Sequence, residues 1–319
     1  MSDFMLNVAS GPQTVTNNDT KRLMTDVLIG LAPTTLWGIY LFRLDAFITL
    51  AICIVACVGF EYLYTKLMKL PTTIGDRSAV VTGLLLGLNL SSNIPWWICI
   101  IGSFVAIIMA KMLFGGIGYN FMNPALAARC FLLISFTARM TSFVAVKGHE
   151  LMDGVTGPTP LTIQKTDGYQ GLNLLDMFLG YKGGVIGEVS ILALLIGGAY
   201  LVIRRVITLR IPLAYMLTFA VFTFFFGKYN FDFQYVLMQL CTGGIVLGAV
   251  FMATDYTTSP VTPKGEIIFG ILLGIMTGLF RGPNSEGVSY AIILGNLLVP
   301  LIERVTVPKY FGKEGKQNG

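Results

Sequence analysis

The sequence predicts an all-α polytopic membrane protein with about ten transmembrane helices. Hydrophobic residues make up 54% of the 319 residues and charged residues only 12%, whereas about a quarter of the residues in a soluble domain are charged. The mean hydropathy is +0.72. Apolar runs recur along the chain at roughly the 17–25 residues that a helix needs to cross a bilayer.

The predicted spans follow one another along almost the whole chain. We place them at 23–42, 46–68, 78–93, 96–114, 122–138, 185–207, 211–227, 234–253, 265–281 and 288–305. The first run follows Lys21 and Arg22 and meets no small-residue cleavage site, so we interpret it as a span and not as a signal peptide. The third and fifth runs are short and are interrupted by polar residues.

The runs divide into two halves around one long connection. We expect an N-terminal five-helix repeat at 1–138, an extracytoplasmic loop at 139–184 and a C-terminal five-helix repeat at 185–319. Each half has a Gly-rich apolar run, a polar break and then an Asn, a Pro and a closing Arg, as in "VTGLLLGLNLSSN" with "NFMNPALAAR" and "GGIVLGAVFMATDYTTSP" with "GNLLVPLIER". Because five spans are an odd number, the two repeats are expected to be inverted.

The distribution of basic residues predicts the sidedness. Lys and Arg are more frequent in the segments on the side of the two termini, for example at Arg204, Arg205 and Arg210, and such segments stay in the cytoplasm. The 139–184 loop then faces outward. We attribute the net charge of +5 to this topology and to contact with lipid headgroups. The sequence has no basic cluster interleaved with aromatic residues, so we expect no nucleic-acid binding.

Polar residues interrupt two spans of the first half. Asn89 lies in "GLNLSSNIPWW", and Asn120, Asn123 and Arg129 lie in "GIGYNFMNPALAAR". Lipid cannot satisfy the backbone groups that a break frees, so the breaks indicate a polar cavity, a bound polar ligand or a re-entrant segment. Helix capping is the alternative, since Asn123 before Pro124 is a good N-cap. The acidic residues lie toward span ends, and any ion path is expected to be polar and neutral or shared with another subunit.

The sequence does not encode a complete redox active site. The run "GGIGYN" ends an apolar span and does not follow a strand, so it is typical of helix packing and not of dinucleotide binding. No ferredoxin-type CxxC run is present. Cys53 and Cys57 share a helix face, but no second pair completes a metal site, and we expect buried thiols. NADH and ferredoxin chemistry is therefore expected in other subunits.

The polar segment "ELMDGVTGPTPLT", residues 150–162, has turn chemistry throughout. Asp153 and Gly154 favour a tight turn, and Pro158 and Pro160 remove backbone donors and stiffen the chain. We expect this segment to present Thr159 on an exposed arc. On composition alone, an ordinary outward loop would explain the same residues.

The segment resembles the flavinylation motif Asp-Gly-x-Ser/Thr-Gly-Ala-Thr. In that motif a dedicated flavin transferase attaches FMN to the last threonine through a phosphoester bond. The residues that match it are Asp153, Gly154, Thr156, Gly157 and Thr159, and Pro158 replaces the alanine. The resemblance implies that Thr159, and not Thr156, is the attachment residue.

The resemblance extends over nearly the whole chain. The segments "NNDTKRLMTDVLIGLAPTTLWGIYLF", "GDRSAVVTGLLLGLNL", "NFMNPALAAR" and "VFMATDYTTSPVTPKG" are similar to the RnfD family. This family comprises the RnfD component of the Rnf complex, the ion-translocating ferredoxin:NAD⁺ oxidoreductase, and its homologue in the Na⁺-pumping NADH:quinone oxidoreductase. The resemblance implies a urea-transporter-like fold in a prokaryotic cytoplasmic membrane. It also implies partner subunits that carry flavins and iron–sulfur clusters, and an electron relay coupled to Na⁺ or H⁺ transport.

The family further implies a second, noncovalent flavin, riboflavin, in some members. We expect it near the polar breaks, at Asn89, Asn120, Asn123 and Arg129. The repeat and the breaks alone would equally suit a protein of another class, a passive channel or transporter for a small polar solute. The Thr159 motif and the segment resemblances favour the electron-transfer subunit.

Overall fold

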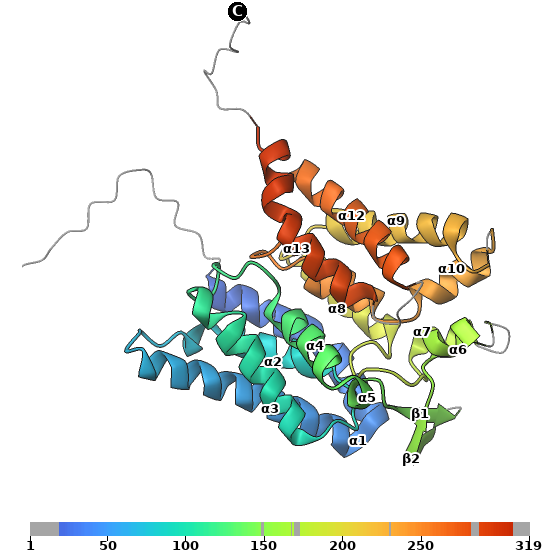
Figure 1. Ribbon diagram of the computed structural model, residues 1–319, viewed down its shortest axis with the longest axis horizontal. Coiled ribbons are helices and arrows are strands. Elements are labelled where there is room, and N and C mark those ends of the chain that lie inside the picture. The colour runs from blue at the N-terminus through green and yellow to red at the C-terminus, as the bar shows by residue number, and fades with distance from the viewer. Residues whose placement is uncertain are drawn as a thin grey trace, which may run out of the picture.

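The computed structural model describes residues 19–147, 150–166, 168, 173–229, 231–281 and 287–308, and the side chains of these residues apart from 145–147, 150–156 and 165–166. The outer ends of the two predicted repeats, 1–18 and 309–319, lie outside the described residues. Figure 1 shows two helical bodies side by side, one formed by the first half of the chain and one by the second.

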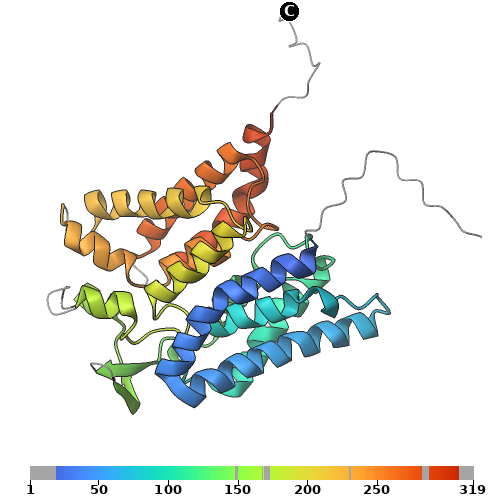
Figure 2. The same ribbon diagram turned by 180° about the vertical axis from the view of Figure 1, so that it is seen from behind.

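The N-terminal body starts with one long helix that folds back on itself. Helix α1 (Thr20–Leu67) holds both of the first two predicted spans and reverses at Arg43, whose φ of 53° and ψ of −135° are not helical. Figure 2 shows the two arms of α1. The body continues with η1 (Ile74–Asp76), α2 (Ser78–Leu88), α3 (Trp96–Phe104), a π-helical turn (Val105–Met109), η3 (Met112–Phe114), α4 (Pro124–Ser135) and α5 (Thr137–Met140).

The connection between the halves contains a small sheet that the all-α prediction lacks. Strands β1 (Phe143–Lys147) and β2 (Glu150–Gly157) are antiparallel. Val144 faces Thr156 and Val146 faces Leu151, so β2 bulges over residues 152–155. Two short helices follow, α6 (Pro160–Thr166) and α7 (Leu174–Leu179). The turn chemistry of Asp153 and Gly154 thus appears as a bulge within a strand.

The C-terminal body repeats the pattern of apolar helices with one broken span. Its elements are α8 (Ile191–Ile203), α9 (Arg210–Phe226), α10 (Phe233–Leu240), α11 (Ile245–Leu247), a π-helical turn (Gly248–Met252), α12 (Pro263–Arg281) and α13 (Gly287–Thr306). The predicted span 234–253 is bent by 63° between α10 and the segment Ile245–Met252. Gly243 and Gly244 form the break, with φ angles of 66° and 64°.

Small residues bring the helices into close contact. Gly270, Gly274 and Gly278 lie along α12 at intervals of one turn and face α9. A Cβ atom at Gly274 would lie 2.7 Å from the Cβ atom of Thr218, so only glycine permits this packing. Gly30 of α1 faces Gly197 of α8 in the same way, and this contact joins the two bodies. Such small-residue stripes are typical of helix pairs in membranes.

The helices agree with a membrane protein, although fewer are long than the ten predicted spans require. Among the described residues, four helices are long and apolar enough to cross a bilayer, or five if the bent pair counts as one span. The helices α2, α4, α8 and α9 are apolar but shorter. The predicted span 78–93 is too long, because α2 already ends at Leu88.

The loop elements and the chain ends lie at opposite ends of the molecule. Strands β1 and β2 and helices α6 and α7 gather at one end in both views, whereas the first turn of α1 and the last turn of α13 lie at the other (Figures 1 and 2). This separates the candidate attachment residue from the described ends of the chain.

Candidate functional site

Thr159 lies between the sheet and a helix and caps that helix. Strand β2 ends at Gly157, and α6 begins at Pro160. The Thr159 hydroxyl oxygen accepts a hydrogen bond of 3.3 Å from the Thr162 backbone N–H, and its carbonyl accepts one of 3.0 Å from Ile163. A Thr followed by Pro suits this position, since Thr is a good N-cap and Pro at the first helical position needs no donor.

The expectation of an exposed arc is wrong at Thr159 itself. This residue is 8% exposed, while Pro158 and Thr162 on either side are exposed. The hydroxyl oxygens of Thr159 and Thr162 are 3.0 Å apart. The other motif residues, Asp153, Gly154 and Thr156, belong to β2, and their side chains lie outside the described part. The structure thus places Thr159, the last threonine of the motif, directly before α6 and largely buried.

The burial of Thr159 follows from the docking of α6 against the C-terminal body. Gln164, on α6, is 1% exposed, and its side-chain oxygen accepts a hydrogen bond of 2.8 Å from Nε2 of Gln239 on α10. Gln239 in turn accepts a hydrogen bond of 3.0 Å from Arg281. Leu161 packs against the backbone at Gly243. The turn that carries Thr159 is therefore fixed to the break between α10 and α11.

Two buried cations hold the carbonyl end of α10 at this break. Arg281 donates to the carbonyls of Gln239 at 2.6 Å, Thr242 at 2.5 Å and Gly243 at 3.0 Å. Lys182 donates to the carbonyl of Cys241 at 2.6 Å. Cations at a helix C-terminus are favoured by the helix dipole and satisfy the carbonyls left without helical partners. Lys182 and Arg281 were used in the sequence analysis only as charges that indicate sidedness. The double glycine of "CTGG" was the local signal for a helix break at this position.

Lys182 lies outside the membrane-spanning segments and is 5% exposed. Burial lowers the pKa of its ammonium group from the ordinary 10.5, and the nearby Glu188 carboxylate opposes this by raising the pKa. Desolvation penalises the charged form of a lysine, whereas a carboxylate favours it. Lys182 thus places its amino group at the break between α10 and α11, where it donates to the Cys241 carbonyl.

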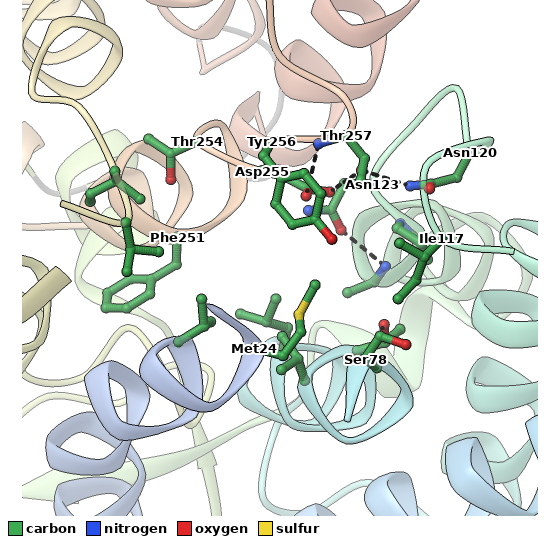
Figure 3. A pocket seen from close by; sticks show the side chains of 18 of the residues that line it. Met24, Ser78, Ile117, Asn120, Asn123, Phe251, Thr254, Asp255, Tyr256 and Thr257 are labelled. Atoms are coloured by element: carbon green, nitrogen blue, oxygen red, sulfur yellow. Dashed lines mark hydrogen bonds between the residues drawn. The ribbon is translucent and has the colours of Figure 1, made fainter. Parts of the chain in front are cut away.

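A second candidate site is a cavity between the two bodies (Figure 3). Its volume is about 90 Å³. One rim is polar, since Asn120 donates to the Thr257 hydroxyl at 3.2 Å and that hydroxyl donates to Asp255 at 3.0 Å. The opposite wall is apolar and includes Met24 and Phe251. This space has room for only a few water molecules in its present shape.

Asn123 lies on the same cavity and also caps a helix. Its side-chain oxygen accepts hydrogen bonds from the N–H groups of Ala125 and Leu126 at 3.1 and 3.3 Å, at the start of α4. Its amide nitrogen donates to the carbonyl of Met252 at 3.4 Å. The predicted N-cap is confirmed, and the same residue reaches across to the C-terminal body.

Asn89 and Arg129 do not line this cavity. Arg129 is 5% exposed and donates to both the carbonyl and the side-chain oxygen of Asn89 at 2.8 Å. Asn89 is the C-cap residue of α2 and also donates to the Met252 sulfur at 3.7 Å. The structure therefore divides the four polar residues expected near a second flavin into a cavity pair, Asn120 and Asn123, and a structural pair, Asn89 and Arg129.

The buried acids are paired with basic or hydroxyl groups. Glu61 is 0% exposed and lies 2.6 Å from the ammonium group of Lys111. Asp26 accepts from Arg204 at 3.3 Å and from the Tyr200 hydroxyl at 3.0 Å. Within the described residues, no group of three His, Cys, Asp or Glu side chains could hold a metal ion. The pairing of Glu61 with Lys111 escaped the sequence analysis, because the two residues are fifty positions apart.

Comparison with known proteins identifies relatives over nearly the full length. The model of the NQR2, RnfD, RnfE family matches residues 7–312. The chain is 45% identical over 317 residues to the D component of the Na(+)-translocating ferredoxin:NAD(+) oxidoreductase complex of Acetobacterium woodii, and the match covers 98% of this chain and 97% of that protein. It is 38% identical over 320 residues to the D component of the proton-translocating ferredoxin:NAD(+) oxidoreductase complex of Clostridium ljungdahlii, covering 97% and 96%. It is 36% identical over 328 residues to the D component of the ion-translocating oxidoreductase complex of Stutzerimonas stutzeri, covering 92% and 93%.

Proposed function

The chain belongs to the NQR2, RnfD, RnfE family, and we propose that it is the RnfD component of an ion-translocating ferredoxin:NAD⁺ oxidoreductase complex, with FMN attached covalently to Thr159. The observation that carries the proposal is the agreement of full-length similarity with a motif at 153–159 that matches at every defined position except Pro158. The protein would relay electrons between flavin and iron–sulfur partner subunits. The relatives translocate Na⁺ in one case and protons in another, as their names state, so the ion is not assigned.

The geometry at Thr159 fits a phosphoester. In the N-cap, the hydroxyl oxygen acts as an acceptor for the Thr162 N–H, and an ester oxygen retains an acceptor lone pair. The cap is therefore compatible with attachment. The hydroxyl of Thr162, 3.0 Å away, then has to act as the donor in its contact with Thr159.

The flavin supplies the redox chemistry when it is bound. The chain itself contributes the acceptor oxygen and a rigid mount. Gln164 and Leu161 fix α6 to the C-terminal body, so that the attachment oxygen is held in one position relative to the membrane helices. The sequence carries neither a dinucleotide fingerprint nor a cluster-binding cysteine run, and the chemistry of NADH and ferredoxin is assigned to partner subunits.

We also propose that the fold is two inverted five-helix repeats, similar to the urea transporter. The opposite placement of the loop and the described chain ends (Figure 1) supports an outward loop with cytoplasmic termini. Each half also has a helix end held by a buried arginine, Arg129 at Asn89 and Arg281 at Gln239. Labelling of a single cysteine introduced at the exposed Pro158 tests the orientation: a membrane-impermeant maleimide should modify it in intact cells, and labelling only after lysis would reverse the topology.

Of the four residues expected near a second, noncovalent flavin, Asn120 and Asn123 line the cavity between the two bodies. The cavity of about 90 Å³ is smaller than the roughly 300 Å³ or more of a typical ligand pocket. A flavin ring does not fit its present shape, and we derive no step through it. Asn89 and Arg129 bond to each other and would support the end of α2 without touching the ligand.

In-gel flavin fluorescence tests the attachment. The chain is produced with an active flavin transferase, denatured and separated on a gel, together with Thr159→Asn and Thr159→Ser. Asn preserves the helix cap but offers no hydroxyl, whereas Ser preserves both. We expect fluorescence from the wild type and Thr159→Ser and a dark band from Thr159→Asn, with Thr162→Val as a fluorescent control. A fluorescent Thr159→Asn band, or a dark wild-type band beside a labelled reference substrate, would refute the assignment.

A further inference from the structure

A groove opens between α9, α10 and α12 at the end of the molecule that carries the loop. The glycine stripe of α12 holds α9 close as far as Gly278, where Phe222 lies against the helix. Beyond this point the space between the helix ends forms a cavity of about 400 Å³. Phe222, Phe226 and Tyr235 line its apolar part, and Lys228, Gln239 and Arg281 line its polar part.

The polar part of the groove is positively charged. Arg281 is 5% exposed, and its guanidinium lies 4.9 Å from the ring centre of Phe219. Lys228 is exposed at the mouth. Among the described residues that line the groove none is acidic. Hydrogen-bonding groups accompany the charges, since the hydroxyls of Thr223 and Tyr235 are also part of the lining.

The groove lies at the depth of a membrane–water interface. Helix α12 has 19 residues, which at about 1.5 Å per residue span about 28 Å, close to the thickness of the hydrocarbon core. The far end of α12 is marked by the ion pair of Arg210 with Glu266 at 3.1 Å. Exposed aromatic residues gather at the groove end, among them Phe225, Phe226, Phe231 and Phe233. Such a belt is typical of the interface.

We propose that this groove binds one anionic phospholipid. Lys228 binds its phosphate at the exposed end of the groove. Arg281 adds the attraction of its buried charge, since its terminal N–H groups already donate to Gln239, Thr242 and Gly243. An acyl chain runs along Phe222 and Phe226 toward the bilayer. Phe226 is 75% exposed, so the apolar wall continues onto the face that lipid covers. A zwitterionic headgroup brings an ammonium group into a site with two cations, which disfavours it. Free phosphate has no apolar part that could pack against the aromatic wall. Basic pockets between membrane helices bind anionic lipid headgroups on the cytoplasmic side, and the same attraction acts in a basic groove at the opposite interface.

The inference is independent of the flavin. It rests on the groove of the C-terminal body alone, and Arg281 is part of the frame of that body through its bonds to the α10 carbonyls. Substitution of Arg281 would disturb the break as well as the groove, so it is unsuitable as a test. Lys228 is exposed, and its replacement leaves the helices in place.

Native mass spectrometry of the full chain, titrated with phosphatidylglycerol or phosphatidylcholine, tests the proposal. We expect one phosphatidylglycerol to be retained in preference to phosphatidylcholine. Lys228→Gln should weaken phosphatidylglycerol binding by about fivefold, the effect of one basic residue near an anionic surface. Arg139→Gln, at an exposed cation outside the groove, should leave binding unchanged. Phe226→Gln should weaken lipid binding too, because it removes the apolar wall.

Three results would overturn the proposal. Equal retention of the two lipids would remove the role of charge. An equal effect of Lys228→Gln and Arg139→Gln would place the lipid elsewhere. Displacement of phosphatidylglycerol by millimolar inorganic phosphate, with phosphate binding unaffected by Phe226→Gln, would identify the groove as a phosphate site and not a lipid site.

Discussion

Removing the ammonium group of Lys111 should destabilise the N-terminal body more than any exposed charge substitution. Lys111 is 3% exposed and Glu61 0% exposed. The ammonium nitrogen lies 2.6 Å from the Glu61 carboxylate and 2.6 Å from the Ser78 hydroxyl. The second carboxylate oxygen accepts a bond of 2.6 Å from Thr73. Lys111→Met keeps the volume of the side chain but leaves the Glu61 carboxylate without its counter-ion.

The magnitude follows from burial. Breaking a buried ion pair by removing one partner costs about 3–5 kcal/mol, while replacing both partners by apolar residues is often close to neutral. We therefore expect Lys111→Met to cost about 3–5 kcal/mol and the double variant Lys111→Met, Glu61→Leu to recover most of it. Thr73 and Ser78 each lose one hydrogen bond in the double variant, which leaves a residual cost of about 1–2 kcal/mol.

The assay is equilibrium unfolding in detergent, with the variants compared in one denaturant series. The matched control is Arg210→Met, which breaks a pair of 3.1 Å in which the arginine side chain is 49% exposed. Exposed pairs contribute about 0–1 kcal/mol. The reasoning fails if Lys111→Met is no more destabilising than Arg210→Met, or if the double variant loses as much stability as the sum of the two single variants.

Three further predictions concern the C-terminal body and the loop. Gly274→Leu should separate α9 from α12, because even a Cβ atom at this position would lie 2.7 Å from the Cβ atom of Thr218. The loss of stability, measured by unfolding in detergent, should exceed about 3 kcal/mol, the upper end of ordinary overpacking. Gln164→Leu removes one of the two acceptors of the buried Gln239 amide and leaves it only the Tyr235 hydroxyl. It should cost about 1–3 kcal/mol, and hydrogen exchange in α6 should rise. Because the pKa of Lys182 is lowered, the folded state binds fewer protons than the unfolded state as the pH approaches 10.5. The free energy of unfolding therefore rises with pH in this range, and Lys182→Met should flatten that rise.

Apolar runs located most of the helices. The runs 265–281 and 288–305 correspond to α12 (Pro263–Arg281) and α13 (Gly287–Thr306) within two residues, because a long apolar segment in a membrane has few alternatives to a helix. The cap of Asn123 was also predictable. A cap depends on residues two and three positions away, and a local sequence carries that information.

The breaks depend on partners that are distant in sequence. Helix α2 ends at Leu88, and the next carbonyl, that of Asn89, is bound by Arg129, forty residues away. The reversal of α1 at Arg43 falls in the gap between the predicted spans 23–42 and 46–68. The sequence therefore marked its position, although not the positive φ angle of a residue other than glycine. Charged or polar residues interrupt the apolar runs at both positions, but hydropathy does not identify the distant partner that binds the end of α2.

The burial of Thr159 has the same kind of origin and changes how the attachment turn is understood. The local sequence has the composition of an exposed turn, yet α6 is docked through the bond between Gln164 and Gln239, which are 75 residues apart. The side-chain oxygen of Gln239 accepts a hydrogen bond from Arg281, and Arg281 also donates to the backbone carbonyl of Gln239 at the end of α10. Two side-chain hydrogen bonds therefore connect helix α6, which Thr159 caps, to the broken span. Leu161 also packs directly against Gly243, so one apolar contact and these hydrogen bonds join the turn of the proposed flavin position to a break in a membrane helix.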